Sequence, residues 1–415
     1  MVNTVKKDVI IIGGGAAGLS AAVACHQRGI RDILIIEREA WLGGILNQCI
    51  HDGFGLEKFH TSLTGPEYAQ RYIDQVQELR IPVMCNSLVT ELTPDKELLV
   101  TNREGLHHYQ AKAVILAMGC RERTRGAITI PGTRPAGIYT AGVAQSLINL
   151  KNYMIGRRIV ILGSGDIGLI MARRLTIEGA EVVLVAEKLP YSSGLPRNIN
   201  QCLYDFDIPL LLNHSVIDIE GQNRLSSVTL SELGPRGGIV RNSARKIPCD
   251  TLLLSVGLIP ENELSRKAGV TIDPFTSGPL VDERGQTSVP GIFCCGNVLQ
   301  VHDIVDWVSL EAEYIVEGVA DYLTSQQPVS SHANIPVKVG KGLQYVVPQI
   351  LRTRQDTTFS FRVTQPSKKG TLVVQDGRKL LRQKTFLRVN PAEMIRLKLS
   401  ADELQGVKGL RVTLR

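Results

Sequence analysis

The stretch VIIIGGGAAGLSAAVACHQRGIRDILIIE, residues 9–37, decides the fold. Apolar β-formers at 9–12 predict a buried parallel strand, and a second run at 33–36 predicts its neighbour. Between them we expect a helix that starts after the glycine-rich turn and stops at Gly29. This strand–helix–strand order, with G-x-G-x-x-G in the first turn, predicts a dinucleotide-binding unit. The alternative is a glycine-rich turn in another α/β fold.

The three glycines and the acid of this stretch have separate roles. Gly13 permits the tight turn, Gly15 lets the backbone approach a pyrophosphate, and Gly18 lets the helix pack closely on the strand. Glu37 follows Gly18 by 19 residues, where a carboxylate accepts hydrogen bonds from ribose hydroxyls. The helix N-terminus adds unpaired N–H groups and the positive end of its dipole. The pattern therefore predicts phosphate binding at the turn and ribose binding at Glu37.

Residues 158–187, RIVILGSGDIGLIMARRLTIEGAEVVLVAE, repeat the pattern. The glycines are Gly163, Gly165 and Gly168, and the acid is Glu187. The first glycine and the acid are 24 residues apart in both copies, and the copies are offset by 150 residues. Two such units imply two dinucleotides, or one domain that was duplicated and left empty. Two sites suit electron transfer between two cofactors.

The composition is that of an ordinary globular protein. The 415 residues are 43% hydrophobic and 21% charged, which suggests two to four domains. No apolar run approaches the ~20 residues of a membrane span, and the N-terminus leads directly into a strand, so we expect no signal peptide. The eight cysteines show no zinc or iron–sulfur spacing. We therefore expect no metal site and a reducing, cytoplasmic compartment.

The charge is unevenly distributed. Residues 331–415 hold 17 Lys and Arg against 5 Asp and Glu, a net charge of +12, whereas the rest of the chain carries −5. The plain interpretation is a solvated basic module. The sharper one is docking to an acidic partner protein, or to the acidic body of a second copy in a homo-oligomer. Nucleic-acid binding is not expected, because no recognition motif accompanies the charge.

The segment WLGGILNQCIH, residues 41–51, follows the first unit. From here the chain, over roughly 5–323, resembles the two-domain flavoproteins of the pyridine nucleotide–disulfide oxidoreductase superfamily, near those associated with glycerol-3-phosphate, opine and amino-acid dehydrogenases. The resemblance implies FAD in the first unit and NAD(H) or NADP(H) in the second. It implies an α/β fold with two Rossmann-like, doubly wound domains, followed here by a small C-terminal β domain. The expected segments are 1–125 and 259–325 for FAD, 126–258 for NAD(H), and 335–415 for a β-sandwich.

The cysteine pair of that superfamily is missing. It follows Gly-Gly as GGxCxxxxC, and the two cysteine positions here hold Leu46 and His51, with Cys49 between them. A dithiol relay needs two thiols, so ordinary disulfide reduction is not expected. Cys49 is either a single reactive thiol or a packed one. His51 is either a general acid/base or a hydrogen-bonded structural histidine.

Three strand ends are further implied to lie at the cofactors. The run 113–119 ends in Met118-Gly119, and the run 251–257 ends in Gly257, as the glycine-ended strands of the superfamily do. The run 290–297 ends in Gly296-Asn297, where the superfamily has Gly-Asp for the ribityl chain of FAD. An amide also binds hydroxyl groups, so FAD remains the expected cofactor.

A helix over 308–323 is implied to point its N-terminus at the flavin, where its dipole stabilises negative charge. Trp307 and Val308 are the candidates for contact with the flavin ring. His302 and Asp306 are weaker candidates, for proton handling, and a loop hydrogen bond is the alternative for His302.

In the second unit the acid favours NAD. A carboxylate at Glu187 would accept a hydrogen bond from the free 2′-hydroxyl of NAD and repel the 2′-phosphate of NADP. Lys188 and Arg197 leave NADP open. The predicted catalytic residues are Cys49, His51 and His302. The predicted cofactor-binding residues are the motif positions and their neighbours: Gly13, Gly15, Ala16, Ala17, Gly18, Glu37, Arg38, Gly44, Met118, Gly119, Gly163, Gly165, Asp166, Ile167, Gly168, Glu187, Lys188, Gly257, Gly296, Asn297, Trp307 and Val308.

The leading hypothesis is an FAD-dependent oxidoreductase that passes hydride between NAD(H) and flavin. Without a dithiol, it would work with a partner dehydrogenase of the glycerol-3-phosphate or amino/opine acid type. One alternative is a stand-alone NADH-dependent reductase or oxidase that uses Cys49 on a peroxide or small disulfide. The other is a non-catalytic partner subunit that holds FAD structurally.

Overall fold

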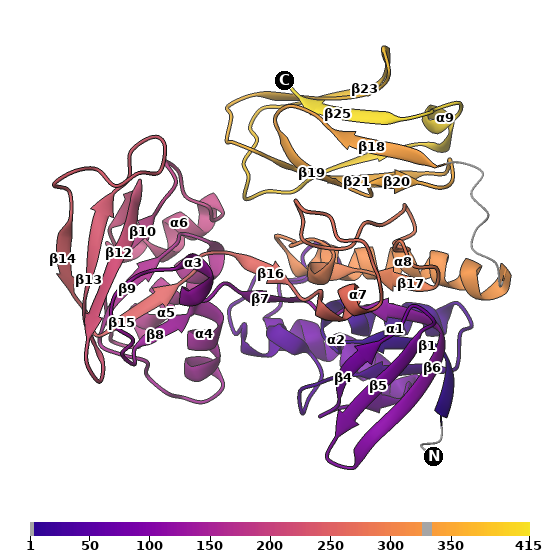
Figure 1. Cartoon of the computed structure of the whole chain (residues 1–415), viewed down its shortest axis with the longest axis horizontal. Coiled ribbons are helices and arrows are strands. Elements are labelled where there is room, and N and C mark those ends of the chain that lie inside the picture. The colour runs from indigo at the N-terminus through magenta and orange to yellow at the C-terminus, as the bar shows by residue number, and fades with distance from the viewer. Residues whose placement is uncertain (1–3, 326–333) are drawn as a thin grey trace. The chain divides into compact units, whose positions relative to one another are not determined.

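The computed structural model describes residues 4–325 and 334–415, which belong to two compact units. One unit comprises Met1–Cys120 with Pro260–Arg415, and the other is Arg121–Ile259. The chain leaves the first unit through β7 (Cys120–Glu122) and returns through β16 (Leu258–Pro260), and these two strands pair in a two-stranded sheet (Figure 1). The second unit is therefore an insertion into the first.

The first unit is built on a seven-stranded sheet in the order β3-β2-β1-β6-β5-β4, with β17 paired to β6. Strands β1, β2, β3, β6 and β17 are parallel, whereas β4 and β5 form an antiparallel meander with β6. The elements are β1 (Thr4–Ile12), α1 (Ala16–Gln27), β2 (Ile33–Ile36), η1 (Gly44–Gln48), α2 (Gly65–Glu78), β3 (Val83–Met84), β4 (Leu88–Leu92), β5 (Glu97–Asn102), β6 (Gly105–Leu116), α7 (Glu263–Lys267), β17 (Ile292–Cys294), η3 (Gly296–Val298) and α8 (Val305–Ser325).

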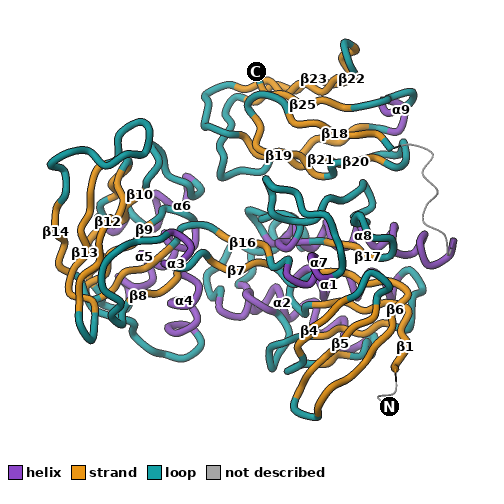
Figure 2. The backbone as a smooth tube through the Cα atoms, in the orientation of Figure 1, coloured by secondary structure: helices purple, strands orange, loops and turns teal. Residues whose placement is uncertain are grey.

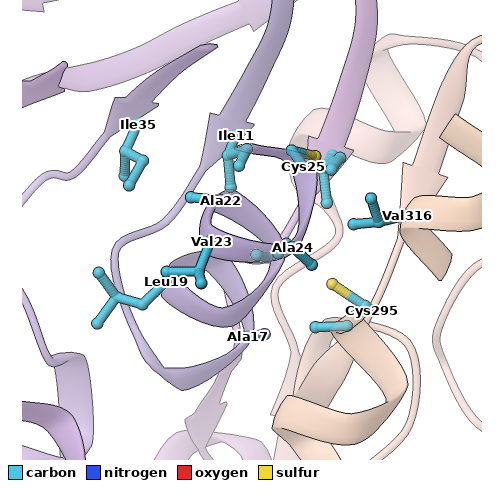
Figure 3. Packing of buried hydrophobic residues seen from close by; sticks show 14 of the residues in the cluster. Ile11, Ala17, Leu19, Ala22, Val23, Ala24, Cys25, Ile35, Cys295 and Val316 are labelled. Carbon is cyan, nitrogen blue, oxygen red and sulfur yellow. The ribbon is translucent and has the colours of Figure 1, made fainter. Parts of the chain in front are cut away.

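Helices α1, α2 and α8 cover one face of this sheet. Ile11 of β1 and Ile35 of β2 are fully buried under small residues of α1 such as Ala22, and Figure 3 shows Val316 of α8 against the same helix. Small side chains let α1 lie close to both the sheet and α8. The core of this unit thus joins two segments that are far apart in the sequence.

The vicinal cysteines are core residues on opposite faces of the sheet, as strand alternation requires. Cys294 packs with the meander side, and Cys295 packs with α1, as Figure 3 shows. Both are fully buried.

The second unit repeats the arrangement with a five-stranded sheet in the order β11-β10-β9-β15-β8, all of it parallel. A three-stranded antiparallel sheet, β12-β13-β14, accompanies it. The elements are α3 (Arg125–Ile128), β8 (Ile138–Thr140), α4 (Ala141–Asn149), β9 (Arg158–Leu162), α5 (Asp166–Ile177), β10 (Glu181–Glu187), α6 (Pro196–Cys202), η2 (Tyr204–Phe206), β11 (Leu210–Leu212), β12 (His214–Gly221), β13 (Leu225–Glu232), β14 (Arg245–Pro248) and β15 (Thr251–Leu254).

The C-terminal β domain, residues 334–415, belongs to the first unit and is built of strands joined by loops, with one short helix (Figure 2). A five-stranded sheet, β20-β18-β25-β22-β23, and a three-stranded sheet, β19-β21-β24, enclose one apolar core. The elements are β18 (Ile335–Val339), β19 (Leu343–Val347), β20 (Ile350–Leu351), β21 (Thr357–Val363), β22 (Gly370–Asp376), β23 (Lys379–Phe386), β24 (Ile395–Leu399), α9 (Ala401–Leu404) and β25 (Leu410–Leu414).

The predicted fold class is confirmed, but two predicted boundaries were wrong. The first strand, predicted over 9–12, already begins at Thr4. The predicted helix 308–323 begins three residues earlier, at Val305, so Trp307 and Val308 lie within its first turn. The buried carboxylate of Asp306 makes this start possible, because it accepts backbone N–H groups from Gly55 and Lys58 at 3.1 and 2.8 Å. No helix within residues 4–325 or 334–415 is long and apolar enough to span a bilayer.

Candidate functional site

Close backbone packing shapes the first glycine-rich turn. Gly13 has φ +109°, and a Cβ there would lie 2.4 Å from the carbonyl oxygen of Ala117. At Gly18 a Cβ would lie 1.8 Å from the carbonyl oxygen of Gly13, so only glycine lets α1 pack this close to β1. At Gly15 the nearest atom would be the Cα of Gly44, 4.0 Å away. Protein packing does not explain that glycine, whereas the approach of a phosphate would.

The N-terminus of α1 is open to a ligand. Its N-cap, Gly15, supplies no capping side chain, and the first turn holds no acidic residue. The first N–H groups of the helix, among them those of Ala16 and Ala17, have no intrahelical partner, and the helix dipole favours an anion there. Beside them the N–H of Gly43 donates to the carbonyl of Gly14 at 2.8 Å. This backbone set suits a pyrophosphate.

Glu37 at the end of β2 is buried and held by the backbone. Its Oε2 accepts the N–H of Gly14 at 2.6 Å, and its Oε1 accepts the N–H of Glu39 at 2.8 Å. The predicted ribose acceptor thus stands beside the phosphate turn. Arg38 is exposed and lies 3.7 Å from the carboxylate of Glu39.

The second turn copies the first one. A Cβ at Gly163 would lie 2.0 Å from the carbonyl oxygen of Ser255, and one at Gly168 would lie 2.6 Å from the Cβ of Ser255. Gly165 is again the least crowded of the three, with the Oγ of Ser255 at 3.1 Å as nearest atom. The N-cap of α5 is Gly165, and it also provides no capping side chain.

Glu187 repeats the environment of Glu37. Its Oε2 accepts the N–H and the hydroxyl of Ser164, at 3.0 and 2.6 Å, and the hydroxyl of Ser193 at 3.1 Å. Its Oε1 accepts the N–H of Leu189 at 3.0 Å. Only 4% of the residue is exposed, so the carboxylate is fixed in place. Lys188 beside it is exposed, as is Arg197.

Asp166 has a structural role within the second unit. Its Oδ1 accepts the N–H of Leu195 at 2.8 Å and the side-chain amide of Asn198 at 2.7 Å, which ties α5 to the start of α6. Ile167 is half-buried and packs on the core of this unit. Both are next to the phosphate turn, as predicted, but the carboxylate of Asp166 is directed toward α6.

Two of the predicted strand-end glycines have a left-handed backbone. Gly119 has φ +71° and Gly257 has φ +103°, and only distant or no protein atoms would meet a Cβ at either position. Met118 is half-buried beside the meander face of the first unit. The glycines therefore serve the backbone conformation at the carboxyl ends of β6 and β15.

Gly296 lies where the N-termini of α1 and α8 meet. A Cβ at Gly296 would lie 2.8 Å from the Cβ of Ala17 and 3.2 Å from Cγ1 of Val308. Asn297 uses its Oδ1 to accept the N–H of His302 at 3.0 Å, and its Nδ2 has no partner among the described residues. The amide thus keeps its two donors for a ligand, where the superfamily's Asp would offer an acceptor.

His302 and Glu311 form a buried pair beneath this site. The Nδ1 of His302 lies 2.9 Å from the carbonyl oxygen of Gln300, and its Nε2 lies 3.4 Å from the carboxylate of Glu311. Both ring nitrogens face oxygen atoms, so the orientation of the ring is fixed. Burial raises the pKa of Glu311, but the charge of His302 and the bonds from His302, Gln300 and Gly296 outweigh it and lower the pKa overall. This environment suits a fixed charge pair better than proton exchange with solvent.

Cys49 and His51 occupy the loop after η1 and do not contact each other through any described bond. The thiol of Cys49 donates to the carbonyl of Ile45 at 3.3 Å, and burial raises its pKa to about 12. The ring of His51 lies 4.9 Å from that of Phe54, and its Nδ1 is 3.0 Å from the carbonyl oxygen of Asp52. Neither residue has the surroundings of an activated nucleophile or base.

Comparisons with known proteins agree with this geometry. Residues 7–314 match the family described as pyridine nucleotide-disulphide oxidoreductase. This chain belongs to that family. It is an FAD-dependent NAD(P)H oxidoreductase, and it binds FAD and NAD(P)H. The C-terminal β domain lies outside the matched residues.

Named relatives share this matched region. The mitochondrial dihydrolipoyl dehydrogenase of Caenorhabditis elegans is 29% identical over 348 residues, 77% of this chain and 68% of that protein. Hydrogen cyanide synthase subunit HcnB of Pseudomonas protegens is 28% identical over 316 residues, 70% of this chain and 65% of that protein. The chain thus matches about two thirds of each relative's length. The crystal structure of T. acidophilum thioredoxin reductase has the same fold, with a TM-score of 0.64 at 22% identity over 78% of this chain and 99% of that one.

The residues present fit both cofactors. The open space at Gly15 and the uncapped N-terminus of α1 suit the FAD pyrophosphate, Glu37 suits the adenosine ribose, and the amide of Asn297 suits ribityl hydroxyls. Gly165 and Glu187 offer the nicotinamide dinucleotide the same features. When bound, the flavin supplies the hydride chemistry.

Sequence reasoning missed three residues near α8. Glu311 falls on the buried face of that helix, and a lone acid on an apolar face was the available signal. Arg362 and Arg396, from the C-terminal β domain, contact the segment 301–307. The local sequence does not indicate a role for either arginine, because both lie on strands with the usual alternation of buried and exposed positions.

Proposed function

We propose that this flavoprotein transfers electrons between NAD(H) and a separate dehydrogenase, without a thiol relay. The observation that carries the proposal is the chemistry at the two positions where family members hold a redox-active cysteine pair. Leu46 is a buried core residue and His51 a loop histidine. The eight cysteines, all within the described residues, form no disulfide. Electrons that reach the flavin from NADH would therefore need another exit.

The alternative of a Cys49-dependent reductase receives less support. The thiolate is the reactive form, and with a pKa raised by burial to about 12 very little of it exists at neutral pH. The thiol also donates to a carbonyl oxygen within its own loop. Membership in a family of oxidoreductases also gives less support to the other alternative, a non-catalytic subunit that holds FAD structurally.

The environment of Glu187 supports a preference for NAD. Its carboxylate is buried and fixed by four hydrogen bonds, so it cannot turn away from a 2′-phosphate. A negative charge held at that place repels the phosphate of NADP and accepts a bond from the free hydroxyl of NAD. Exposed Lys188 is the nearest residue in sequence that could soften this preference.

The partner would dock on the basic C-terminal β domain. Its net charge is +12, and the edge strand β23 presents Lys379, Arg382 and Lys384 with exposed Leu380 beside them. Charged edges discourage strand pairing and favour an acidic partner. The related HcnB is by its name a subunit of a larger enzyme, which supports a shared task. Eight cysteines without a disulfide support a reducing compartment such as the cytoplasm.

Anaerobic titration with NADH, and separately with NADPH, tests the proposal. We expect NADH to bleach the flavin absorbance at ~450 nm rapidly and NADPH to do so at least about tenfold less efficiently. The reduced protein should then pass electrons to an artificial dye such as dichlorophenolindophenol. It should not turn over hydrogen peroxide or an aromatic disulfide.

A Cys49→Ser variant separates the alternatives. Our proposal expects unchanged bleaching and unchanged dye reduction in this variant. Turnover of peroxide or disulfide by the native protein that is lost in Cys49→Ser would contradict the proposal and establish a single-thiol reductase. Failure of NADH to bleach bound flavin would contradict hydride transfer itself.

A further inference from the structure

The C-terminal β domain packs on the segment that leads into α8. Arg362 of β21 donates to the carbonyl of Val301 at 2.9 Å and forms an ion pair with Asp303. The other oxygen of Asp303 accepts the N–H of Met394. Tyr345 of β19 packs on the core of the sheet below. This domain therefore fixes residues 301–307 from outside.

A second arginine of this domain lies flat on α8. The guanidinium carbon of Arg396 is 3.8 Å from the centroid of the Trp307 ring. Burial lowers the pKa of Arg396 to about 10, so it is still a cation at neutral pH. No described carboxylate forms an ion pair with it. Among the residues that the structure describes, its side chain has one hydrogen bond, to the sulfur of Met394 at 3.5 Å.

The nearest carboxylates are already committed to other groups. Asp303 pairs with Arg362, and Glu311 accepts the N–H of Gly296 and the amide of Gln300 while facing His302. The charges of Glu311 and Asp303 favour the cationic form of Arg396, but neither carboxylate forms an ion pair with it. The guanidinium therefore remains available to a further anion that binds nearby.

The anion that fits is in the adjoining cofactor site. Trp307 lies in the first turn of α8, and the N-terminus of α8 meets that of α1 at Gly296. Ligands of doubly wound sheets bind at the carboxyl ends of the strands, which is where these helices begin. Through its contact with Trp307, Arg396 lies beside the N-terminal turn of α8, at the edge of the expected FAD site.

We propose that Arg396 is a cationic residue of the flavin site, contributed by the C-terminal β domain, which offsets the negative charge that FAD acquires on reduction. The ring of Trp307, 3.8 Å from the guanidinium carbon, helps to hold Arg396 in this place through a cation–π contact. The cation raises the reduction potential of the bound FAD. The β domain is thereby a working part of the redox centre in addition to any docking role.

The test uses the FAD-loaded protein and does not need a partner dehydrogenase. We expect Arg396→Gln to weaken the affinity for sulfite, a small anion that adds to oxidised flavin, by about tenfold. The midpoint potential of the bound FAD should fall by about 30 mV, which is that tenfold change for a two-electron couple. Arg396→Lys, which keeps the charge, should stay close to the native values.

Lys398→Gln is the matched control, because Lys398 lies on the same face of β24 but pairs with Asp356 in solvent. It should leave sulfite affinity and potential unchanged. An Arg396→Gln protein that holds FAD with native potential would overturn the proposal, as would an Arg396→Lys protein that falls equally far.

If Arg396→Gln fails to fold or load FAD, Arg396→His replaces it. Its sulfite affinity relative to the native protein should fall about tenfold between pH 5.5 and 8.5, as the imidazole loses its proton. A ratio that does not change with pH would overturn the proposal. The separate failure of dye reduction or partner transfer would affect only the proposed function.

Discussion

Glu37 and Glu187 end corresponding strands and accept corresponding backbone N–H groups, 150 residues apart. Both are buried, and both also accept the N–H two residues further along the chain. The second carboxylate has two serine hydroxyls in addition, from Ser164 and Ser193. At this scale the choice between the two nicotinamide cofactors depends on the fixed charge of one side chain.

Replacing Glu187 with Gln should erode that choice. Loss of a charged acceptor for a ribose hydroxyl costs about 1.5–3 kcal/mol, so the KM for NADH should rise about tenfold or more. The KM for NADPH should change by less than about threefold or improve, because the repulsion is removed. Steady-state kinetics with both cofactors and dichlorophenolindophenol measure this ratio.

Glu181→Gln is the control, since Glu181 lies on the same strand but is exposed and pairs with Arg158. It should alter neither KM. An unchanged NADH-to-NADPH ratio in Glu187→Gln would show that another residue selects the cofactor.

The element α1 separates two kinds of glycine. A Cβ at Gly18 would collide with the backbone of Gly13, whereas a Cβ at Gly15 would meet only open space. We expect Gly18→Ala to destabilise the fold by about 1–3 kcal/mol or more through overpacking. Gly15→Ala should leave the stability of the FAD-free protein within about 0.5 kcal/mol but weaken FAD binding about tenfold or more.

Thermal unfolding of FAD-free protein and FAD titration measure the two effects independently. Equal losses of stability in both variants would mean that Gly15 is required by protein packing and not by the cofactor.

The elements of the two dinucleotide units could be predicted because their periodicity is strong. Strands of continuous apolar residues and glycine-marked turns placed β1, α1, β9, α5 and both acids correctly. The start of α8 could not be predicted, because it depends on Asp306 accepting N–H groups from a loop some 250 residues earlier in the chain.

At the scale of the whole molecule, a cluster of charges holds the C-terminal β domain to the rest of the first unit. Asp282 accepts the N–H groups of Arg284 and Gln286 and lies 3.1 Å from Nε of Arg352. The neighbouring Glu283 accepts the N–H groups of Arg352 and Thr353. Burial, and then the charge of Glu283, raise the pKa of Asp282 to about 6.

This shift predicts a pH dependence of stability. The pKa of Asp282 in the folded protein is above the ordinary value of 3.8, so ionisation of Asp282 lowers the stability of the fold. This loss of stability is complete above pH 6 and disappears as the pH falls toward 4. The difference in free energy of unfolding between Asp282→Asn and the native protein should therefore shift in favour of the variant by about 2–3 kcal/mol from pH 4.5 to pH 7.5. Thermal unfolding of both proteins across this range measures the difference.

Asp356→Asn is the control with the opposite sign. The pKa of exposed Asp356 is lowered by its bond to Lys398. The stability of Asp356→Asn relative to that of the native protein should therefore not rise with pH. A constant difference between Asp282→Asn and the native protein would contradict the inferred burial of that charge.

The whole-molecule contacts of the candidate site were beyond sequence reasoning. The pairs Arg362–Asp303 and Arg396–Trp307 join residues 59 and 89 positions apart, and each partner looks ordinary in its own strand or helix. Composition identified residues 331–415 as basic. It did not show that two of those arginines face inward to the segment 301–307. Such pairings follow from packing of complete domains and leave no local trace.

The carboxylates that brace both glycine-rich turns have a consequence for how cofactors are captured. Because Glu37 bonds Gly14 and Glu187 bonds Ser164, each turn is braced by a side chain of its own unit and does not depend on the dinucleotide for that support. Binding then loses little backbone entropy, and more of the contact energy goes into affinity. Both binding sites are preorganised, so we expect each dinucleotide to bind in a single kinetic step without a slow ordering phase.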